Sequence, residues 1–233
     1  GTLALPDIPN LSLEDLDRDG AIRESLDRLP RSSRGGFLKV AAGGVATVVA
    51  LGRPDRAAAA LSRGDVAILN YALTLEYLQD AFYTEAERKG ALQGPAARLT
   101  RVVGAVERAH VHALRKVLGR RAVARPFFDF RGVTEDPSSF VRTAVAFEDL
   151  GTAAYKGQAH KIESPEVLAA AVGIHSVEAR HAAWIRYIAG EQPAVEPFDQ
   201  PSSEAETLRL VRKTRFVVRS PRTSAGKAPP FTG

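Results

Sequence analysis

Residues 61–190 repeat apolar side chains every three or four positions, with charged residues between them. This period matches one face of an α-helix, whereas a strand would alternate every second residue. The pattern predicts four helices, at about residues 62–89, 95–118, 137–158 and 165–189. Prolines in the first turns and glycines just after the last turns support these limits, since both residues favour those positions.

The connections between these helices predict how they are arranged. Residues 119–136 form a much longer link than those that join the other neighbours. Short links give antiparallel hairpins and one long link gives a crossover. We therefore expect an all-α protein, with a four-helix bundle at residues 61–190. Residues 1–60 and 191–233 are expected to extend from it as an N-terminal polar arm and a basic C-terminal tail.

Each predicted helix carries a glutamate at mid-length on its apolar stripe, and the second and fourth helices each add a histidine three residues later. The six residues are Glu76, Glu107, His110, Glu148, Glu178 and His181. Two side chains three residues apart lie about 4.5 Å apart along the helix axis and share a face. Each Glu-x-x-His pair can therefore serve one metal centre.

The two hairpins also align as an internal repeat. The segment TLEYLQDAFY, residues 74–83, matches AFEDLGTAAY, residues 146–155, and both place a tyrosine seven residues after the glutamate. Four carboxylates and two imidazoles at one level of a bundle make the ligand set of a dinuclear carboxylate site. Four buried carboxylates without partners would cost many kcal/mol, which bound metal would offset.

These residues, with the segments LNYALTLEYLQDAFY, AFEDLGTAAY and SVEARHAAWIR, resemble the ferritin-like superfamily. The likeness is closest to its exported ferritin-like domain proteins, which include the desiccation-related type. It implies a ferritin-like four-helix bundle that holds two iron or two manganese ions per chain. Because the same ligands serve ferroxidases, oxygenases, rubrerythrin-like peroxidases and manganese catalases in that superfamily, the resemblance implies no single reaction.

The expected roles of the ligands follow from this resemblance. Glu107 and Glu178 would bridge the two metals. Glu76 with His110 would hold one ion, and Glu148 with His181 the other. Carboxylates and imidazoles suit hard, redox-active ions, and the chain has no cysteine for a structural zinc site.

Four further residues are candidates for supporting contacts. Tyr83 and Tyr155 are expected to pack in the core with satisfied hydroxyls; the alternative is that they gate electrons or hydrogen-bond a ligand. Asp80 is a candidate to orient a histidine, as metal sites usually require. His175 is either a partner of Glu178 or a residue on the helix surface.

Residues 32–60 have the layout of an export signal: a basic region, a short apolar stretch and small residues. The segment SRGGFLK resembles a twin-arginine leader, with Gly35 in place of the second arginine. We therefore expect export to the periplasm or cell surface, with transient membrane contact. A leader cleaved after export and an arm kept on the protein are both open interpretations.

The formal net charge is +5, and the densest arginines lie between residues 209 and 222. A basic tail can contact nucleic acid or an anionic membrane, but nothing here predicts specific nucleic-acid recognition. Two classes of function remain. One is a di-metal oxidoreductase of the ferroxidase, peroxidase or catalase kind. The other is a structural subunit that self-associates through residues 1–60, with metals that only stabilise the bundle.

Overall fold

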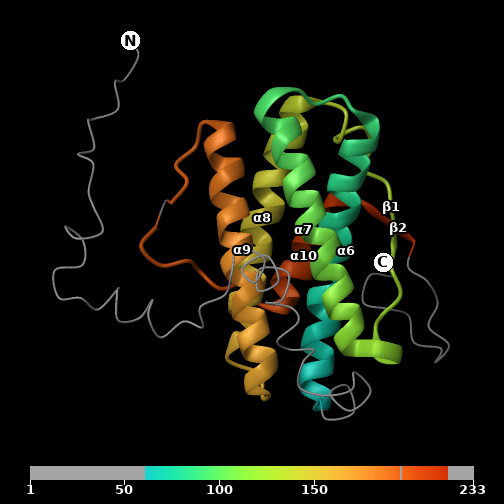
Figure 1. The fold of residues 1–233 in the computed structure, drawn as a ribbon, viewed down its shortest axis with the longest axis vertical. Coiled ribbons are helices and arrows are strands. Elements are labelled where there is room, and N and C mark those ends of the chain that lie inside the picture. Colours follow the sequence, from blue (N-terminus) through green and yellow to red (C-terminus); the bar gives the residue numbers. More distant parts are fainter. Residues whose placement is uncertain (1–60, 195, 220–233) are drawn as a thin grey trace, which may run out of the picture. The chain divides into compact units, whose positions relative to one another are not determined.

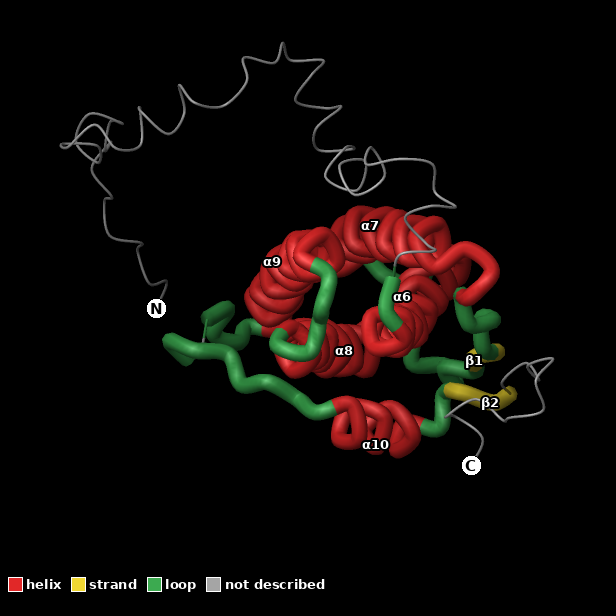
Figure 2. Tube along the Cα trace, turned by 90° about the horizontal axis from the view of Figure 1, so that it is seen from below, coloured by secondary structure: helices red, strands yellow, loops and turns green. Residues whose placement is uncertain are grey.

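The computed structural model describes residues 61–194 and 196–219. Its long helices are α6 (Arg63–Lys89), α7 (Gly94–Leu118), α8 (Pro137–Ala159) and α9 (Pro165–Ala189). Figure 1 and Figure 2 show them as two hairpins, α6 with α7 and α8 with α9, with α7 beside α9 and α6 beside α8. The predicted all-α bundle with one crossover is confirmed.

The helices begin and end where the local sequence predicts. Ser62 and Ser164 cap α6 and α9, each accepting a hydrogen bond from a backbone N–H in the first turn. Asp136 does the same for α8. Gly90 and Gly190 follow α6 and α9 with φ of 66° and 77°, a left-handed backbone that glycine adopts without strain. Capping therefore fixes where the helices stop.

Asp65 joins the start of α6 to the turn between α8 and α9. Its carboxylate is 1% exposed and accepts hydrogen bonds from the backbone N–H groups of Glu163, at 2.9 Å, and Ser164, at 3.1 Å. Both bonds involve a carboxylate and connect the two hairpins. Asp65 thus links the second hairpin to the first at one end of the bundle.

Changing Asp65 to alanine should lower the free energy of unfolding by about 2–3 kcal/mol, because two backbone donors lose a charged acceptor. Urea denaturation measures this change. Asp129→Ala is the matched control, since Asp129 accepts one exposed bond, from Arg131 N–H, and should cost less than about 1 kcal/mol. Equal losses in the two variants would contradict a special role for Asp65.

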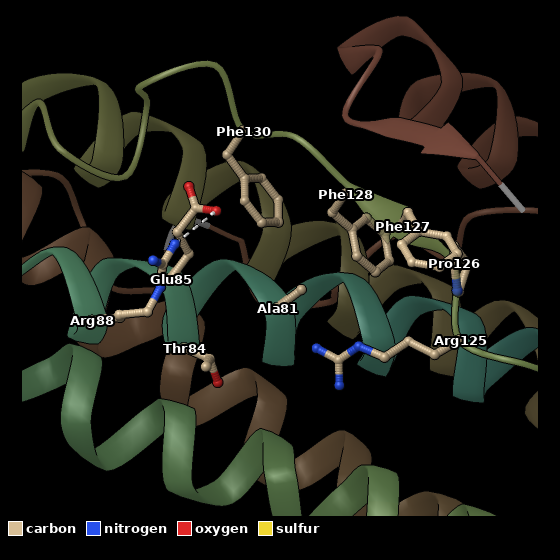
Figure 3. A pocket seen from close by; sticks show the side chains of 9 residues that line it. All are labelled: Ala81, Thr84, Glu85, Arg88, Arg125, Pro126, Phe127, Phe128 and Phe130. Atoms are coloured by element: carbon tan, nitrogen blue, oxygen red, sulfur yellow. Dashed lines mark ion pairs between the residues drawn. The ribbon is translucent and has the colours of Figure 1, made fainter.

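The crossover, residues 119–136, runs along α6. It contains the short helix η1 (Gly119–Arg121) and the strand β1 (Phe127–Phe128). Asn70 on α6 accepts a bond from Val123 N–H at 2.7 Å and donates to Arg121 C=O at 3.0 Å. Further along, Arg125 pairs with Asp80. Between α6 and the crossover lies a cleft of about 500 Å³, which Figure 3 shows from close by.

The C-terminal segment differs from its prediction. Residues 204–219 are not an extended tail but form α10 (Glu204–Thr214) and β2 (Val217–Arg219). Helix α10 packs against α8, and β2 pairs antiparallel with β1 (Figure 2). The buried face of α10 consists of Thr207, Leu208 and Val211. The helix is amphipathic but only 11 residues long, and its many charged residues led to the prediction of a basic tail.

An aromatic cluster joins the crossover, the bundle and the segment before β2. The ring of Phe82, on α6, stacks on Phe140 at 5.0 Å and meets Phe130 and Phe147 edge-on at 5.4 and 5.1 Å. Phe216 packs against Phe130 at 5.3 Å. These contacts fix the crossover on the bundle beside the C-terminal half of α6.

None of the helices in residues 61–194 and 196–219 is long and apolar enough to cross a membrane. The leader-like segment and the last arginine of the basic run, Arg222, lie outside the described residues.

Candidate metal centre

The six predicted ligands come together at mid-height in the bundle, one glutamate from each long helix and one histidine from each of α7 and α9. Their side chains are buried, with exposed fractions of 0–5%. The six are Glu76, Glu107, His110, Glu148, Glu178 and His181. These polar side chains lie on the apolar face of each helix, and this face is turned to the interior of the bundle.

The six side chains form two overlapping groups of four. The first contains Glu76 and His110, the second contains Glu148 and His181, and both contain Glu107 and Glu178. Within each group one ligand atom from each residue lies within 4.8 Å of all the others. Each group could hold one metal ion, and the two shared glutamates lie where two such positions would adjoin.

Short distances link each imidazole to three carboxylates. His110 Nδ1 lies 3.3 Å from Glu76, 3.4 Å from Glu107 and 3.2 Å from Glu178. His181 Nδ1 lies 3.0 Å from Glu107, 3.4 Å from Glu148 and 3.9 Å from Glu178. Nδ1 of each histidine therefore points to the interior of its group.

The inward atoms have no hydrogen-bond partner among the described residues. They are Glu76 Oε2, both oxygens of Glu107, His110 Nδ1, Glu148 Oε2, Glu178 Oε1 and His181 Nδ1. A buried polar atom without a partner is rare and costly, and seven of them around one point need compensation. Oxygen and imidazole donors fit metal cations, so the residues present suit a metal pair.

The outward oxygens of three of the glutamates are held by neighbouring side chains. Tyr155 on α8 donates to Glu76 Oε1 at 2.5 Å, and Tyr83 on α6 donates to Glu148 Oε1. Gln79 donates through Nε2 to Glu178 Oε2 at 3.3 Å. The tyrosine of α6 thus holds the glutamate of α8, and the tyrosine of α8 holds the glutamate of α6, because these two helices pack antiparallel.

Burial and like charge shift the pKa values of the shared glutamates. Burial, with the charges of Glu178 and Glu76, raises the pKa of Glu107 well above its usual range. Burial is also the main cause that raises the pKa of Glu178 to about 7. Both shifts favour the neutral, protonated carboxyl when no metal is present.

The pKa values of the two imidazoles are raised, although burial alone would lower them. Burial alone would lower the pKa of His181, but the carboxylates of Glu107 and Glu148 close to its Nδ1 favour the charged ring and raise the pKa to about 10. The pKa of His110 is raised too, because Glu76, Glu107 and Glu178 outweigh its burial. Both imidazoles are therefore doubly protonated and positively charged at neutral pH when no metal is present.

Two of the four supporting candidates contact the cluster and two do not. Tyr83 and Tyr155 are buried in the core with satisfied hydroxyls, as expected, and these hydroxyls bond to carboxylates of the cluster. The interpretation of Asp80 as a histidine partner is wrong, because its carboxylate accepts from Thr84 and pairs with Arg125. His175 makes no hydrogen bond to Glu178, and its Nε2 is buried without a partner among the described residues.

The contact between Gln79 and Glu178 was not predicted from the sequence. Gln79 lies three residues after Glu76, one turn along the stripe, where its counterpart after Glu148 is Gly151. A polar side chain at that spacing was the available signal. Its partner on α9 follows only from the packing of the helices.

The fold and this cluster define a four-helix bundle with a buried carboxylate and histidine centre. A family model, the ferritin-like domain, matches residues 64–191 of the chain. The chain therefore belongs to the ferritin-like domain family. Among curated proteins no match was found.

Proposed function

We propose that this protein binds two iron or manganese ions in the bundle and carries out redox chemistry on iron, oxygen or peroxide. The observation that supports this most is the convergence of seven buried ligand atoms without partners, from all four helices. Glu107 and Glu178 would be shared by the two positions. Glu76 with His110 would complete the first position, and Glu148 with His181 would complete the second.

The donor set supports a redox-active metal. Four carboxylates and two imidazoles are hard or intermediate donors, and the chain has no cysteine to select zinc or copper(I). Two such ions side by side would supply a one-electron change at each position. The chain itself contributes a dry, prearranged setting, because Tyr83, Tyr155 and Gln79 hold the carboxylates from outside.

A ferrous oxidation assay tests the proposed activity. Protein loaded anaerobically with ferrous iron is mixed with oxygen or with hydrogen peroxide, and the ferric absorbance is followed. Oxidation faster than in a Glu107→Gln variant under the same conditions is the expected result. Metal that binds without accelerating oxidation, and manganese-loaded protein that leaves peroxide intact, would instead favour a structural subunit stabilised by its metals.

Metal binding should release protons at pH 7. The imidazoles of His110 and His181 are protonated in the metal-free protein, because their pKa values lie above the ordinary range. A metal binds only the neutral ring, so affinity should rise with pH, by about tenfold per unit for each proton released. Calorimetric titration in two buffers of different ionisation enthalpy measures this release. Heats that do not depend on the buffer would contradict it.

The protein acts outside the cytoplasm in this proposal. The support is the export-signal layout of residues 32–60, which follows the twin-arginine pattern except at Gly35. That route carries folded proteins, so a metal centre could be loaded before export. Self-association through residues 1–60 is proposed on the same segment.

A further inference from the structure

The two halves of the bundle place a glutamate and a tyrosine equivalently, but they differ at a position beside the cluster. Glu76 and Glu148 occupy equivalent places on α6 and α8, as do Tyr83 and Tyr155. Three residues after the first glutamate the chain has Gln79, but three residues after the second it has Gly151. The only amide beside the ligands in the described part of the chain is therefore on one side.

Gln79 occupies the space that Gly151 leaves. Its Nε2 donates to Glu178 Oε2 at 3.3 Å, and both groups are buried. A Cβ at Gly151 would lie 3.2 Å from Glu178 Oε2 and 3.3 Å from Gln79 Oε1, closer than most such contacts. The glycine thus lets the amide of Gln79 reach Glu178.

The two shared glutamates consequently differ in how many oxygens are free. Both oxygens of Glu107 lack a partner among the described residues, whereas Glu178 has only Oε1 free. Glu107 Oε1 lies 3.0 Å from His181 and Oε2 lies 3.4 Å from His110, so one oxygen faces each position. Glu178 Oε1 lies nearer to His110, at 3.2 Å, than to His181, at 3.9 Å.

We propose that Gln79 is a positioning residue that makes the two metal positions unequal, by holding Glu178 Oε2 away from the metals. The position at Glu76 and His110 then receives four ligand atoms. The position at Glu148 and His181 would share Glu178 less fully and would bind its ion more weakly. This inference rests on the proposed binding of two metals.

Metal uptake should therefore occur in two steps, the first at Glu76 and His110. Calorimetric titration of the metal-free full chain with Mn²⁺ should give two dissociation constants at least about tenfold apart. At one Mn²⁺ per chain, electron paramagnetic resonance should show isolated Mn²⁺. The coupled signal of a metal pair should grow only as the second ion is added.

The variant Gln79→Met keeps the length of the side chain but removes the amide. Freed from Gln79, Glu178 Oε2 can turn toward the Glu148 position, so the ratio of the two constants should fall about tenfold. The coupled signal should then appear at one Mn²⁺ per chain. Gly151→Ala provides a second test, because its Cβ would lie 3.2 Å from Glu178 Oε2 and 3.3 Å from Gln79 Oε1 and would crowd this hydrogen bond without removing the amide. It keeps the proposal testable if Gln79→Met does not fold.

Gln158→Met is the matched control, since Gln158 is also buried but contacts Lys161 rather than the cluster. It should leave both constants and the spectrum unchanged. Two equal steps in the unchanged protein would overturn the inference while leaving the proposed function intact. Unequal steps that survive in both test variants would overturn the role of Gln79. No Mn²⁺ or Fe²⁺ bound by the unchanged protein would instead refute the proposed function itself.

Discussion

Changing Glu107 to glutamine should abolish the stabilisation that added metal gives, while leaving the melting temperature of the metal-free protein nearly unchanged. Burial and the charges of the neighbouring Glu178 and Glu76 raise the pKa of Glu107, which favours its neutral, protonated carboxyl when no metal is present. Glutamine is close in shape and charge to that protonated form. It cannot, however, supply the two negative oxygens that face the two metal positions.

The expected size of the metal effect follows from binding linkage. A ligand at 100 times its dissociation constant stabilises the folded state by about 2.7 kcal/mol, or roughly 5–10 °C in melting temperature for a domain of this size. Differential scanning calorimetry with Mn²⁺ and with a chelator measures the shift. Glu135→Gln, at an exposed residue that pairs with Lys89, should keep the full shift. A Glu107→Gln variant that also keeps it would contradict the assignment.

Changing Phe82 to alanine should lower the free energy of unfolding by about 3–5 kcal/mol, as truncation of a buried aromatic ring does. Phe82 is 0% exposed and its ring touches the rings of Phe130, Phe140 and Phe147. The change would leave a cavity where the crossover meets the bundle. It would also remove aromatic pairs that each contribute about 0.5–1.5 kcal/mol beyond burial.

Urea denaturation of Phe82→Ala measures this loss, and Phe198→Ala is its control. Phe198 is 76% exposed, so its truncation should change the free energy by no more than about 0.5 kcal/mol. A Phe82→Ala protein as stable as the control would mean that the aromatic cluster does not hold the crossover in place.

The bundle could be predicted because its signals are local. Apolar residues at helical spacing, prolines in first turns and glycines after last turns gave the limits of α6, α7, α8 and α9 to within one residue. The clustering of the six side chains could also be predicted, because each lies on an apolar stripe and such stripes face the interior. The repeat of the two hairpins placed the four glutamates at one level.

The remaining contacts depend on packing between distant segments. Asp80 lies one turn after Glu76, but the crossover brings Arg125 to it, and no local pattern gives the path of an 18-residue link. The hydrogen bond from Gln79 on α6 to Glu178 on α9 likewise needs the positions of both helices. Helix α10 has an amphipathic pattern, but it is short, and only its packing against α8 shows that its apolar face is buried.

The most direct test of the account is the metal content of the protein, measured by elemental analysis after purification without added metal. The account predicts about two iron or manganese ions per chain, and their loss in the double variant Glu107→Ala, Glu178→Ala. No bound metal in the unchanged protein, even after incubation with Fe²⁺ or Mn²⁺, would contradict it. So would a double variant that keeps both ions.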